Sequence, residues 1–397
     1  MEHQNRTINI LAIIIFTATL GLGILGPILP LYANDLGATM AQIGFLTSAW
    51  SLSRLIFTAP MGRYSDRSSK KRVIVAGLFI YCIVSLFYAF SWNFTSLITI
   101  RIIHGMGSAM AMPIAQAYGA EIAPGGKEGQ YMGVLSRAMM VGVAFGPFLG
   151  GTLTDYASKE AAFYAMGILT GISLVLAMKF LPDVKFKGEG YKVSGSFKAM
   201  LVNRSMFTVL FYRFLSTIAM SSIFGFMSIY LSQPASSGGM NLPISTIGLI
   251  LSVGQFISAS FQKEFGKLAD RYDKNNIIII SGVIGSLSLM MFPMMKSTIG
   301  IFIVQLIFVC GLTLGYPALN AIVVIAGREY GTGTAISALQ SSNSLGNIIG
   351  PLVAGVLLDS IKFSSMFSIA GIMMIISVVI FYLLSRGEIY PQLVREV

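Results

Sequence analysis

Long apolar stretches follow one another along almost the whole chain, separated by short polar segments. A helix needs roughly 20 mostly apolar residues to cross a bilayer. We predict twelve such helices, at residues 8–33, 40–62, 73–92, 94–122, 130–155, 160–182, 204–232, 243–265, 276–295, 297–326, 331–359 and 362–385. The first stretch is too long for the apolar core of a signal peptide, so we expect it to remain as the first helix.

Composition and charge agree with a membrane protein. The 397 residues are 55% hydrophobic and 11% charged, whereas a soluble domain carries about 25% charged residues. If the N-terminus is cytoplasmic, three of the 27 Lys and Arg lie outside, four lie within predicted spans, and the other 20 lie on the inner side. This is the positive-inside distribution. It explains the net charge of +11 without nucleic acid and places both termini in the cytoplasm.

The second half of the chain repeats the first at an offset of 204 residues. Matching positions include Gly266 with Gly62, Asp270 with Asp66, Arg271 with Arg67, Gly350 with Gly146, Pro351 with Pro147 and Asp359 with Asp155. We therefore predict an all-α membrane protein whose twelve transmembrane helices form two pseudo-symmetric six-helix bundles, residues 1–182 and 204–397. Residues 183–203, rich in Lys, Gly and Ser, are expected to form a cytoplasmic linker.

Three local motifs combine glycine with charged or proline residues. The first follows the second predicted helix and consists of Gly62, Asp66, Arg67, Lys70 and Lys71, with Asp270 and Arg271 as its repeat. The second lies on the fourth helix and consists of Arg101, Gly105 and Gly107. The third, on the fifth helix, consists of Gly142, Gly146, Pro147, Gly150 and Gly151, and the eleventh helix repeats it as Gly346, Gly350 and Pro351.

Each motif has a physical interpretation of its own. Gly62 is expected to permit a tight turn, and the basic residues that follow it indicate an inner loop. Small residues spaced by four let helices approach closely in a membrane, and a proline in such a stripe bends the helix. The glycine stripe is therefore expected to pack helices tightly. A further hypothesis makes it a seal and pivot between the bundles, so that Gly146→Leu would abolish function and leave folded protein.

Together these motifs resemble those of the major facilitator superfamily, and most closely its twelve-span drug:proton antiporter branch. The sequence departs from the family pattern at Ser69 and Tyr64, where glycine and leucine are usual, and at His104, where glutamine is frequent. The resemblance implies a transporter, not an enzyme, with its substrate site near the bilayer midplane and protons as the coupling ion. It also implies that Asp66 and its basic neighbours latch the cytoplasmic side while the protein is open outward.

The two halves differ at their intramembrane charges. Arg54, Arg101 and Arg137 correspond to Ser258, Gln305 and Ser341, and Arg213 corresponds to Asn9. A charge at membrane depth is costly and indicates function, although an arginine near a helix end can also extend to the membrane surface. On the fourth helix, Arg101, His104, Ser108 and Gln116 share one face, which we expect to line a watered cavity.

Carboxylates are absent from the middle of the predicted spans. Proton transfer would then use Asp35 at the outer end of the first helix, His104, or the other acids at span ends, namely Glu121, Asp155 and Asp359. Histidine is suited to this because it titrates near neutral pH. The alternative is a neutral, hydrogen-bonded histidine in the protein interior.

The cargo is predicted from the same residues. Four intramembrane cations without an acid favour anionic or neutral molecules over small cations, while the methionines of the predicted pathway favour adaptable apolar contacts. We predict proton-coupled efflux of amphipathic or lipophilic small molecules by a monomer in a prokaryotic plasma membrane. The alternative is uptake or exchange of an organic anion or a sugar. No cofactor or metal is expected, because the sequence has no Cys/His cluster.

Overall fold

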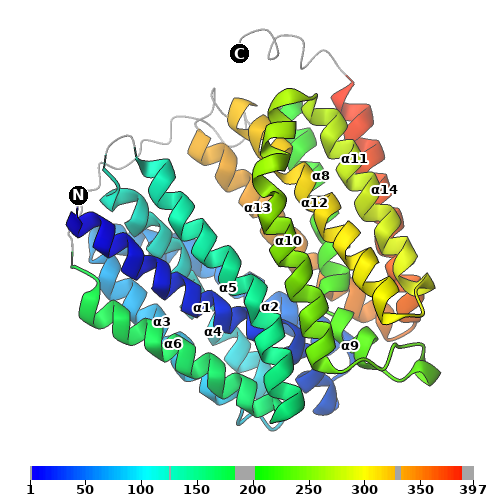
Figure 1. Ribbon diagram of the computed structural model, residues 1–397, viewed down its shortest axis with the longest axis horizontal. Helices are drawn as coiled ribbons and strands as arrows, with labels where there is room; N and C mark the ends of the chain where they lie inside the picture. The colour runs from blue at the N-terminus through cyan, green and yellow to red at the C-terminus, as the bar shows by residue number, and fades with distance from the viewer. Residues whose placement is uncertain (1, 125–126, 184–201, 327–331, 387–397) are drawn as a thin grey trace. The chain divides into compact units, whose positions relative to one another are not determined.

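The computed structural model describes residues 2–124, 127–183, 202–326 and 332–386 (Figure 1). In the first half of the chain the helices are α1 (Glu2–Asp35), α2 (Met40–Arg67), α3 (Lys70–Tyr88), α4 (Phe94–Ile122), α5 (Glu128–Tyr156) and α6 (Lys159–Phe180). In the second half they are α8 (Arg204–Phe224), α9 (Met227–Ser232), η1 (Ala235–Ser237), α10 (Ile244–Arg271), α11 (Lys274–Met291), η2 (Phe292–Met294), α12 (Thr298–Ala326), α13 (Thr332–Leu358) and α14 (Phe363–Ser385). Most of the predicted linker, residues 184–201, lies outside the described residues.

The described helices confirm the predicted all-α membrane fold. In this part of the chain eleven helices are long and apolar enough to cross a membrane, counting α8 and α9 as one span. The twelfth, α2, has 28 residues but is more polar, since it carries Gln42, Arg54 and several Ser and Thr residues. Of these residues, Gln42 takes part in the cap at the start of the helix, and the guanidinium of Arg54 lies 5.3 Å from the centre of the Trp50 ring.

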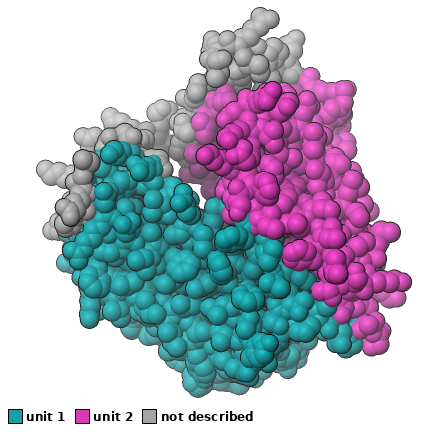
Figure 2. Space-filling model, viewed as in Figure 1, with its two compact units in different colours: residues 1–189, 225–234, 241–256 teal, residues 190–224, 235–240, 257–397 magenta. Residues whose placement is uncertain are grey.

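The helices form two compact units, shown in different colours in Figure 2. Unit 1 comprises residues 1–189, 225–234 and 241–256, and unit 2 comprises residues 190–224, 235–240 and 257–397. The helix α10 therefore begins in unit 1 and ends in unit 2. The division of the chain into domains at residues 183–203 stays a prediction.

Equivalent helices pack together in each unit. In unit 1, α1 lies against α5 and α6, and α3 lies against α4 and α6. In unit 2, α8 lies against α13 and α14, and α11 lies against α12 and α14. These are the same pairs once the offset of 204 residues is applied, so this part of the packing is repeated. The close contact of α2 with α4 has no equivalent of similar extent between α10 and α12.

Polar residues begin several helices where the apolar stretches start. The Thr39 hydroxyl accepts a hydrogen bond from the Gln42 backbone N–H, and the Gln42 side chain accepts one from the Thr39 N–H. Asn93 and Ser96 make the same reciprocal pair at the start of α4. Such pairs satisfy backbone donors that have no partner inside the helix, so the helix starts are well defined by the sequence.

The prediction of a tight turn at Gly62 was wrong. Gly62 lies inside α2, which continues to Arg67, and the connection to α3 consists of Ser68 and Ser69. The Ser69 hydroxyl accepts from the Arg72 backbone N–H at 3.3 Å and so starts α3. Charged residues therefore extend the helix past its apolar stretch, which hydropathy alone does not show.

The predicted seventh helix, residues 204–232, is interrupted. The structure ends α8 at Phe224 and starts α9 at Met227, with Gly225 and Phe226 in a turn between them. Glycine inside a helix is about 1 kcal/mol less favourable than alanine. This cost is one physical reason for a break at Gly225.

The glycine stripe of α5 packs against α1. A Cβ atom at Gly150 would lie 2.8 Å from the Ile24 carbonyl oxygen, and one at Gly146 would overlap the backbone of Gly23. In unit 2, a Cβ atom at Gly346 would lie 2.6 Å from the Cβ of Thr217 on α8. The stripes thus allow close helix contact within each unit.

We expect Gly146→Ala to lower the stability of the protein by about 1–3 kcal/mol, because the added methyl group would force α1 and α5 apart. The larger Gly146→Leu is therefore expected to reduce the amount of folded protein, contrary to the hypothesis drawn from the sequence. Thermal unfolding in detergent measures the effect. Gly133→Ala is the matched control on α5, since a Cβ atom there would meet nothing within 4 Å. An unchanged melting temperature for Gly146→Ala would contradict the prediction.

Candidate functional site

The polar side chains inside unit 1 gather around one tryptophan. We call this group the Trp50 cluster and define it as Trp50 and Arg54 of α2, Tyr81 and Tyr88 of α3, and Arg101 and His104 of α4. The guanidinium carbons of Arg54 and Arg101 lie 5.3 and 5.5 Å from the centre of the Trp50 ring. An aromatic face attracts cations at such distances, so the ring stabilises both charges.

Close helix packing brings these residues together. A Cβ atom at Gly105 of α4 would lie 2.7 Å from the Trp50 carbonyl oxygen and from the Cβ of Ser53. The Ser53 hydroxyl donates to the Ile102 carbonyl at 2.7 Å. On the α3 side, a Cβ atom at Gly107 would lie 3.1 Å from the Gly77 carbonyl oxygen. The glycines of the second motif therefore let α4 approach both α2 and α3.

His104 lies at the buried side of the cluster. Its side chain is fully buried, its Nδ1 lies 3.1 Å from the Tyr88 hydroxyl, and its ring centre lies 4.3 Å from that of Tyr81. The neighbouring Ser108 is also buried. The prediction that this face lines a watered cavity was therefore wrong for His104, which Tyr81 and Tyr88 of α3 cover, and for Ser108, which is buried.

Several polar atoms of the cluster lack a hydrogen-bond partner. They are Trp50 Nε1, the Tyr81 hydroxyl, Arg101 Nε and Nη1, and His104 Nε2. The ion pairs of the described residues lie at helix ends and involve neither Arg54 nor Arg101. Buried polar groups without partners are costly. Unpartnered polar atoms beside two arginine side chains therefore indicate a site that binds another molecule.

The other predicted site residues lie elsewhere. Gln116 of α4 donates to the Met139 sulfur at 3.6 Å, and Arg137 is exposed on α5. Arg213 of unit 2 lies 5.3 Å from the centre of the Tyr316 ring. Asp35 pairs with Lys159 at the end of α1. The structure therefore brings together Arg54, Arg101 and His104 and leaves the remaining candidates outside the Trp50 cluster.

The first motif forms an ion-pair network at the basic end of unit 1. Lys70 is 4% exposed, and its Nζ lies 2.9 Å from both Asp66 Oδ1 and Glu121 Oε1. Asp183 accepts from the Ser69 hydroxyl and lies 3.8 Å from Arg72. The network ties the start of α3 to the ends of α2 and α4. The latch implied for Asp66 stays a prediction, as do the roles of Arg67, Lys71, Asp270 and Arg271.

At the opposite end of the helices, α5 contacts the first turns of α10 within unit 1. The Asp155 carboxylate accepts from the backbone N–H groups of Ile244, at 3.2 Å, and Ser245, at 2.7 Å. Because Pro243 precedes α10, the helix has no side chain of its own suited to cap it. Asp155 of α5 caps it instead. The Phe148 N–H donates to the Ser252 hydroxyl at 2.9 Å.

Glycine makes this contact between α5 and α10 close. A Cβ atom at Gly248 would overlap the Pro147 carbonyl, and one at Gly151 would overlap the Ile244 carbonyl. The sequence singled out Gly151 and Pro147 for packing but gave no indication that α10 is their partner. A negative charge at a helix N-terminus is favourable, so Asp155 holds the two helix ends together.

Residues 11–336 match the sequence model of the Major Facilitator Superfamily. The chain belongs to this superfamily. It is therefore a multi-pass membrane transporter and not an enzyme, as its motifs indicated.

Several known membrane transporters resemble this chain. It is 29% identical to an uncharacterized MFS-type transporter of Methanocaldococcus jannaschii, with 96% of this chain and 99% of the relative covered. It is 27% identical to the quinolone resistance protein NorA of Staphylococcus aureus, with 90% and 91% covered. Among solved structures, a bacterial homologue of the lysosomal transporter Spinster has a TM-score of 0.79 at 14% identity, covering 97% of each chain. The nucleoside transporter NupG has a TM-score of 0.77 at 16% identity, covering 98% and 100%. These structures show the shared fold and leave the cargo open.

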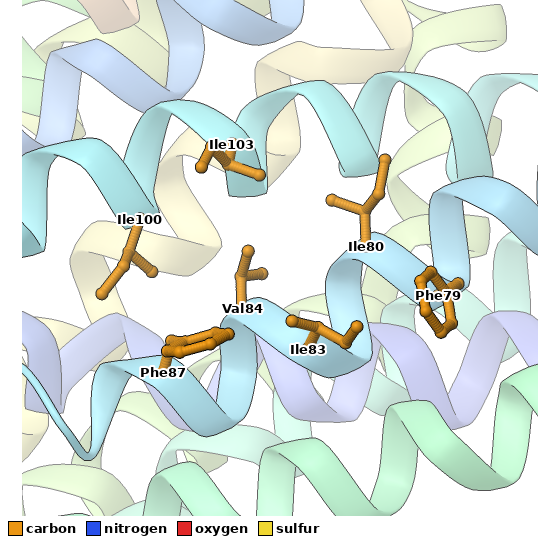
Figure 3. Close-up of a pocket in the computed structure, with 7 residues that line it drawn as sticks. All are labelled: Phe79, Ile80, Ile83, Val84, Phe87, Ile100 and Ile103. Carbon is orange, nitrogen blue, oxygen red and sulfur yellow. The ribbon is translucent and has the colours of Figure 1, made fainter.

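The facilitator also has an apolar groove between α3 and α4, of about 330 Å³ (Figure 3). Its lining consists of Phe79, Ile80, Ile83, Val84, Phe87, Ile100 and Ile103. With no polar side chain, the groove offers no group that could orient a substrate. Among the described residues, no three His, Cys, Asp or Glu side chains gather as a metal site would require. The Trp50 cluster is therefore the candidate functional site.

We expect Asp155→Ala to loosen the contact between α5 and α10. Asp155 is exposed, and a carboxylate at an exposed helix N-terminus contributes about 0.3–1 kcal/mol, where about 1.4 kcal/mol corresponds to a tenfold change in an equilibrium. Amide hydrogen exchange at residues 244–252 should accelerate by about twofold to fivefold. Thr154→Ala is the control, because the Thr154 hydroxyl donates only within α5, to Gly150. Equal exchange in both variants would count against this role of Asp155.

Proposed function

We propose that this facilitator exports amphipathic or lipophilic small molecules in exchange for protons, by alternating access. The observation that carries the proposal is the Trp50 cluster, in which two cations and an aromatic ring meet without any acid. Such a site favours molecules that combine an apolar body with a hydrogen-bond acceptor. The similarity to a protein named for quinolone resistance supports export of drug-like compounds.

Proton coupling rests on the resemblance of the motifs to the antiporter branch. The candidate proton carriers are His104 and the acids at span ends, Asp35, Glu121, Asp155 and Asp359. His104 is hydrogen-bonded to Tyr88 within the Trp50 cluster, and Asp35 is paired with Lys159 at the end of α1. An exchange mechanism requires that substrate and proton are bound in different steps, and a protonatable group next to the site would meet that requirement.

The membrane orientation follows from the distribution of charge. The end of unit 1 that carries Arg67, Lys70, Lys71 and Arg72 is proposed to face the cytoplasm. Asp155 and the start of α10 would then face outward. On this basis the contact between α5 and α10 closes the outer side, and its opening gives access from outside. We place the protein in a prokaryotic plasma membrane with both termini in the cytoplasm, acting as a monomer.

Reconstituted protein tests the proposal. Proteoliposomes with an imposed pH gradient should move an amphipathic fluorescent dye against its concentration gradient, and movement should stop when an ionophore removes the gradient. The second candidate function, uptake or exchange of an organic anion or a sugar, is favoured by the uncompensated charges of Arg54 and Arg101. Movement of a carboxylate or a sugar without any dye movement would replace the first proposal with the second.

A further inference from the structure

The Trp50 cluster holds more hydrogen-bond donors than its own acceptors can use. Arg101 Nε and Nη1 and Trp50 Nε1 can only donate, and none of them has an acceptor. Arg101 is only 9% exposed, so solvent does not replace the missing acceptors. These donors come from two helices, α2 and α4, and they lie around one ring.

His104 contributes a further unpartnered nitrogen. Its Nδ1 lies 3.1 Å from the Tyr88 hydroxyl, and its Nε2 has no hydrogen-bond partner. If the Tyr88 hydroxyl donates to Nδ1, a neutral imidazole carries its hydrogen on Nε2 and can donate it to a bound molecule.

The charge of the cluster has the same sign throughout. Arg54 and Arg101 both lie within 5.5 Å of the Trp50 ring centre, and neither belongs to an ion pair of the described residues. Arg54 is partly exposed, whereas Arg101 is buried. Arg54 is therefore the more accessible of the two guanidinium groups.

We propose that the Trp50 cluster binds the carboxylate of an amphipathic organic acid, and that such acids are the preferred substrates of this transporter. The inference rests on the proposed function and makes it more specific. A carboxylate has two acceptor oxygens and matches the planar fork of a guanidinium. Arg54 and Arg101 neutralise its charge, Trp50 Nε1 donates a further hydrogen bond, and the half-buried Trp50 ring contacts the apolar part of the molecule.

Intrinsic fluorescence can report on this site directly. The chain has two tryptophans, and Trp92 is 77% exposed, so Trp92→Phe leaves Trp50 as the single emitter with little structural cost. In this background the Trp50 emission is followed at pH 7 during titration with 4-cyclohexylbutanoate and, separately, with its neutral amide. The two probes have nearly the same shape and differ in charge.

We expect the acid to bind at least about tenfold more tightly than the amide. Arg54→Gln should remove this preference, and Arg54→Lys should restore part of it because the charge is kept. Arg386→Gln is the matched control, since Arg386 belongs to unit 2 and also lies near an aromatic ring, 4.2 Å from the centre of Tyr382, without being a member of the cluster. The preference should persist in this variant. Melting temperatures identify any variant that does not fold, and the comparison of the two probes in the Trp92→Phe protein needs no further variant.

Equal affinity for acid and amide would overturn the inference, and so would an acid preference that survives Arg54→Gln. Transport measurements distinguish failure of this inference from failure of the proposed function. If a pH gradient drives dye movement but acid and amide bind alike, the inference fails and the function stands. If the acid binds as expected but no amphipathic molecule moves in response to a pH gradient, proton-coupled export fails and the carboxylate site stands.

Discussion

Gly248→Leu is expected to reduce transport by about tenfold to hundredfold without unfolding the protein. Even a Cβ atom at Gly248 would overlap the Pro147 carbonyl, so a leucine prevents α5 and the first turns of α10 from meeting. Overpacking a contact costs about 1–3 kcal/mol. This corresponds to a decrease of about 5-fold to 150-fold in the population of the state in which α5 and α10 are in contact. An alternating-access cycle slows when one of its two states is depleted.

Folding should survive because the packing of α5 on α1 does not involve Gly248. The Gly150 contact with Ile24 and the Gly146 contact with Gly23 remain. Gly266→Leu is the control on the same helix, since a Cβ atom at Gly266 would meet nothing within 4 Å. Initial transport rates in proteoliposomes, normalised to the amount of folded protein, give the comparison. Full transport activity of Gly248→Leu would show that closure of this contact is not part of the cycle.

Arg101→Gln is expected to lower transport of an amphipathic acid by about a hundredfold. Removing one member of a buried, charge-assisted contact costs about 2–5 kcal/mol, and Arg101 is buried in the cluster. Glutamine is the residue that the second half has at the equivalent position, Gln305, where it is also buried. The substitution should therefore be tolerated by the fold and remove mainly the charge.

The rates for 4-cyclohexylbutanoate and its amide show whether charge is the reason. The acid should lose its advantage in Arg101→Gln, whereas Arg101→Lys should keep part of it, because lysine retains the charge but not the guanidinium fork. Equal losses for acid and amide would indicate a structural defect, and no loss for the acid would contradict the assignment of Arg101 to the substrate site.

Periodicity and composition predicted much of this fold for definite physical reasons. A membrane leaves few structures other than apolar helices, so the spans could be located, and the offset of 204 residues showed that two bundles share one plan. The glycine stripe of α5 was correctly predicted to pack tightly. Helix ends were less well predicted, because α2 continues through the charged residues to Arg67.

The candidate site could be predicted only in part. Arg54, Arg101 and His104 were noticed because charged and titratable residues are rare in apolar helices. Trp50, Tyr81 and Tyr88 were missed, since an aromatic residue in a transmembrane helix is usually part of the packing and has no distinct pattern. The pairing of Asp155 with the start of α10 was missed as well. It joins residues 89 and 90 positions apart, and no local periodicity reports such a contact.

Photolabelling tests the central claim most directly, because it shows where the substrate lies. A photoreactive derivative of 4-cyclohexylbutanoate would be bound to the reconstituted transporter, activated by light, and located by peptide mass spectrometry, with excess unlabelled acid as competitor. The account predicts competed labelling at residues 50–54 of α2, next to Trp50 and Arg54. Competed labelling confined to residues 79–87 of α3, along the apolar groove of Figure 3, would contradict it.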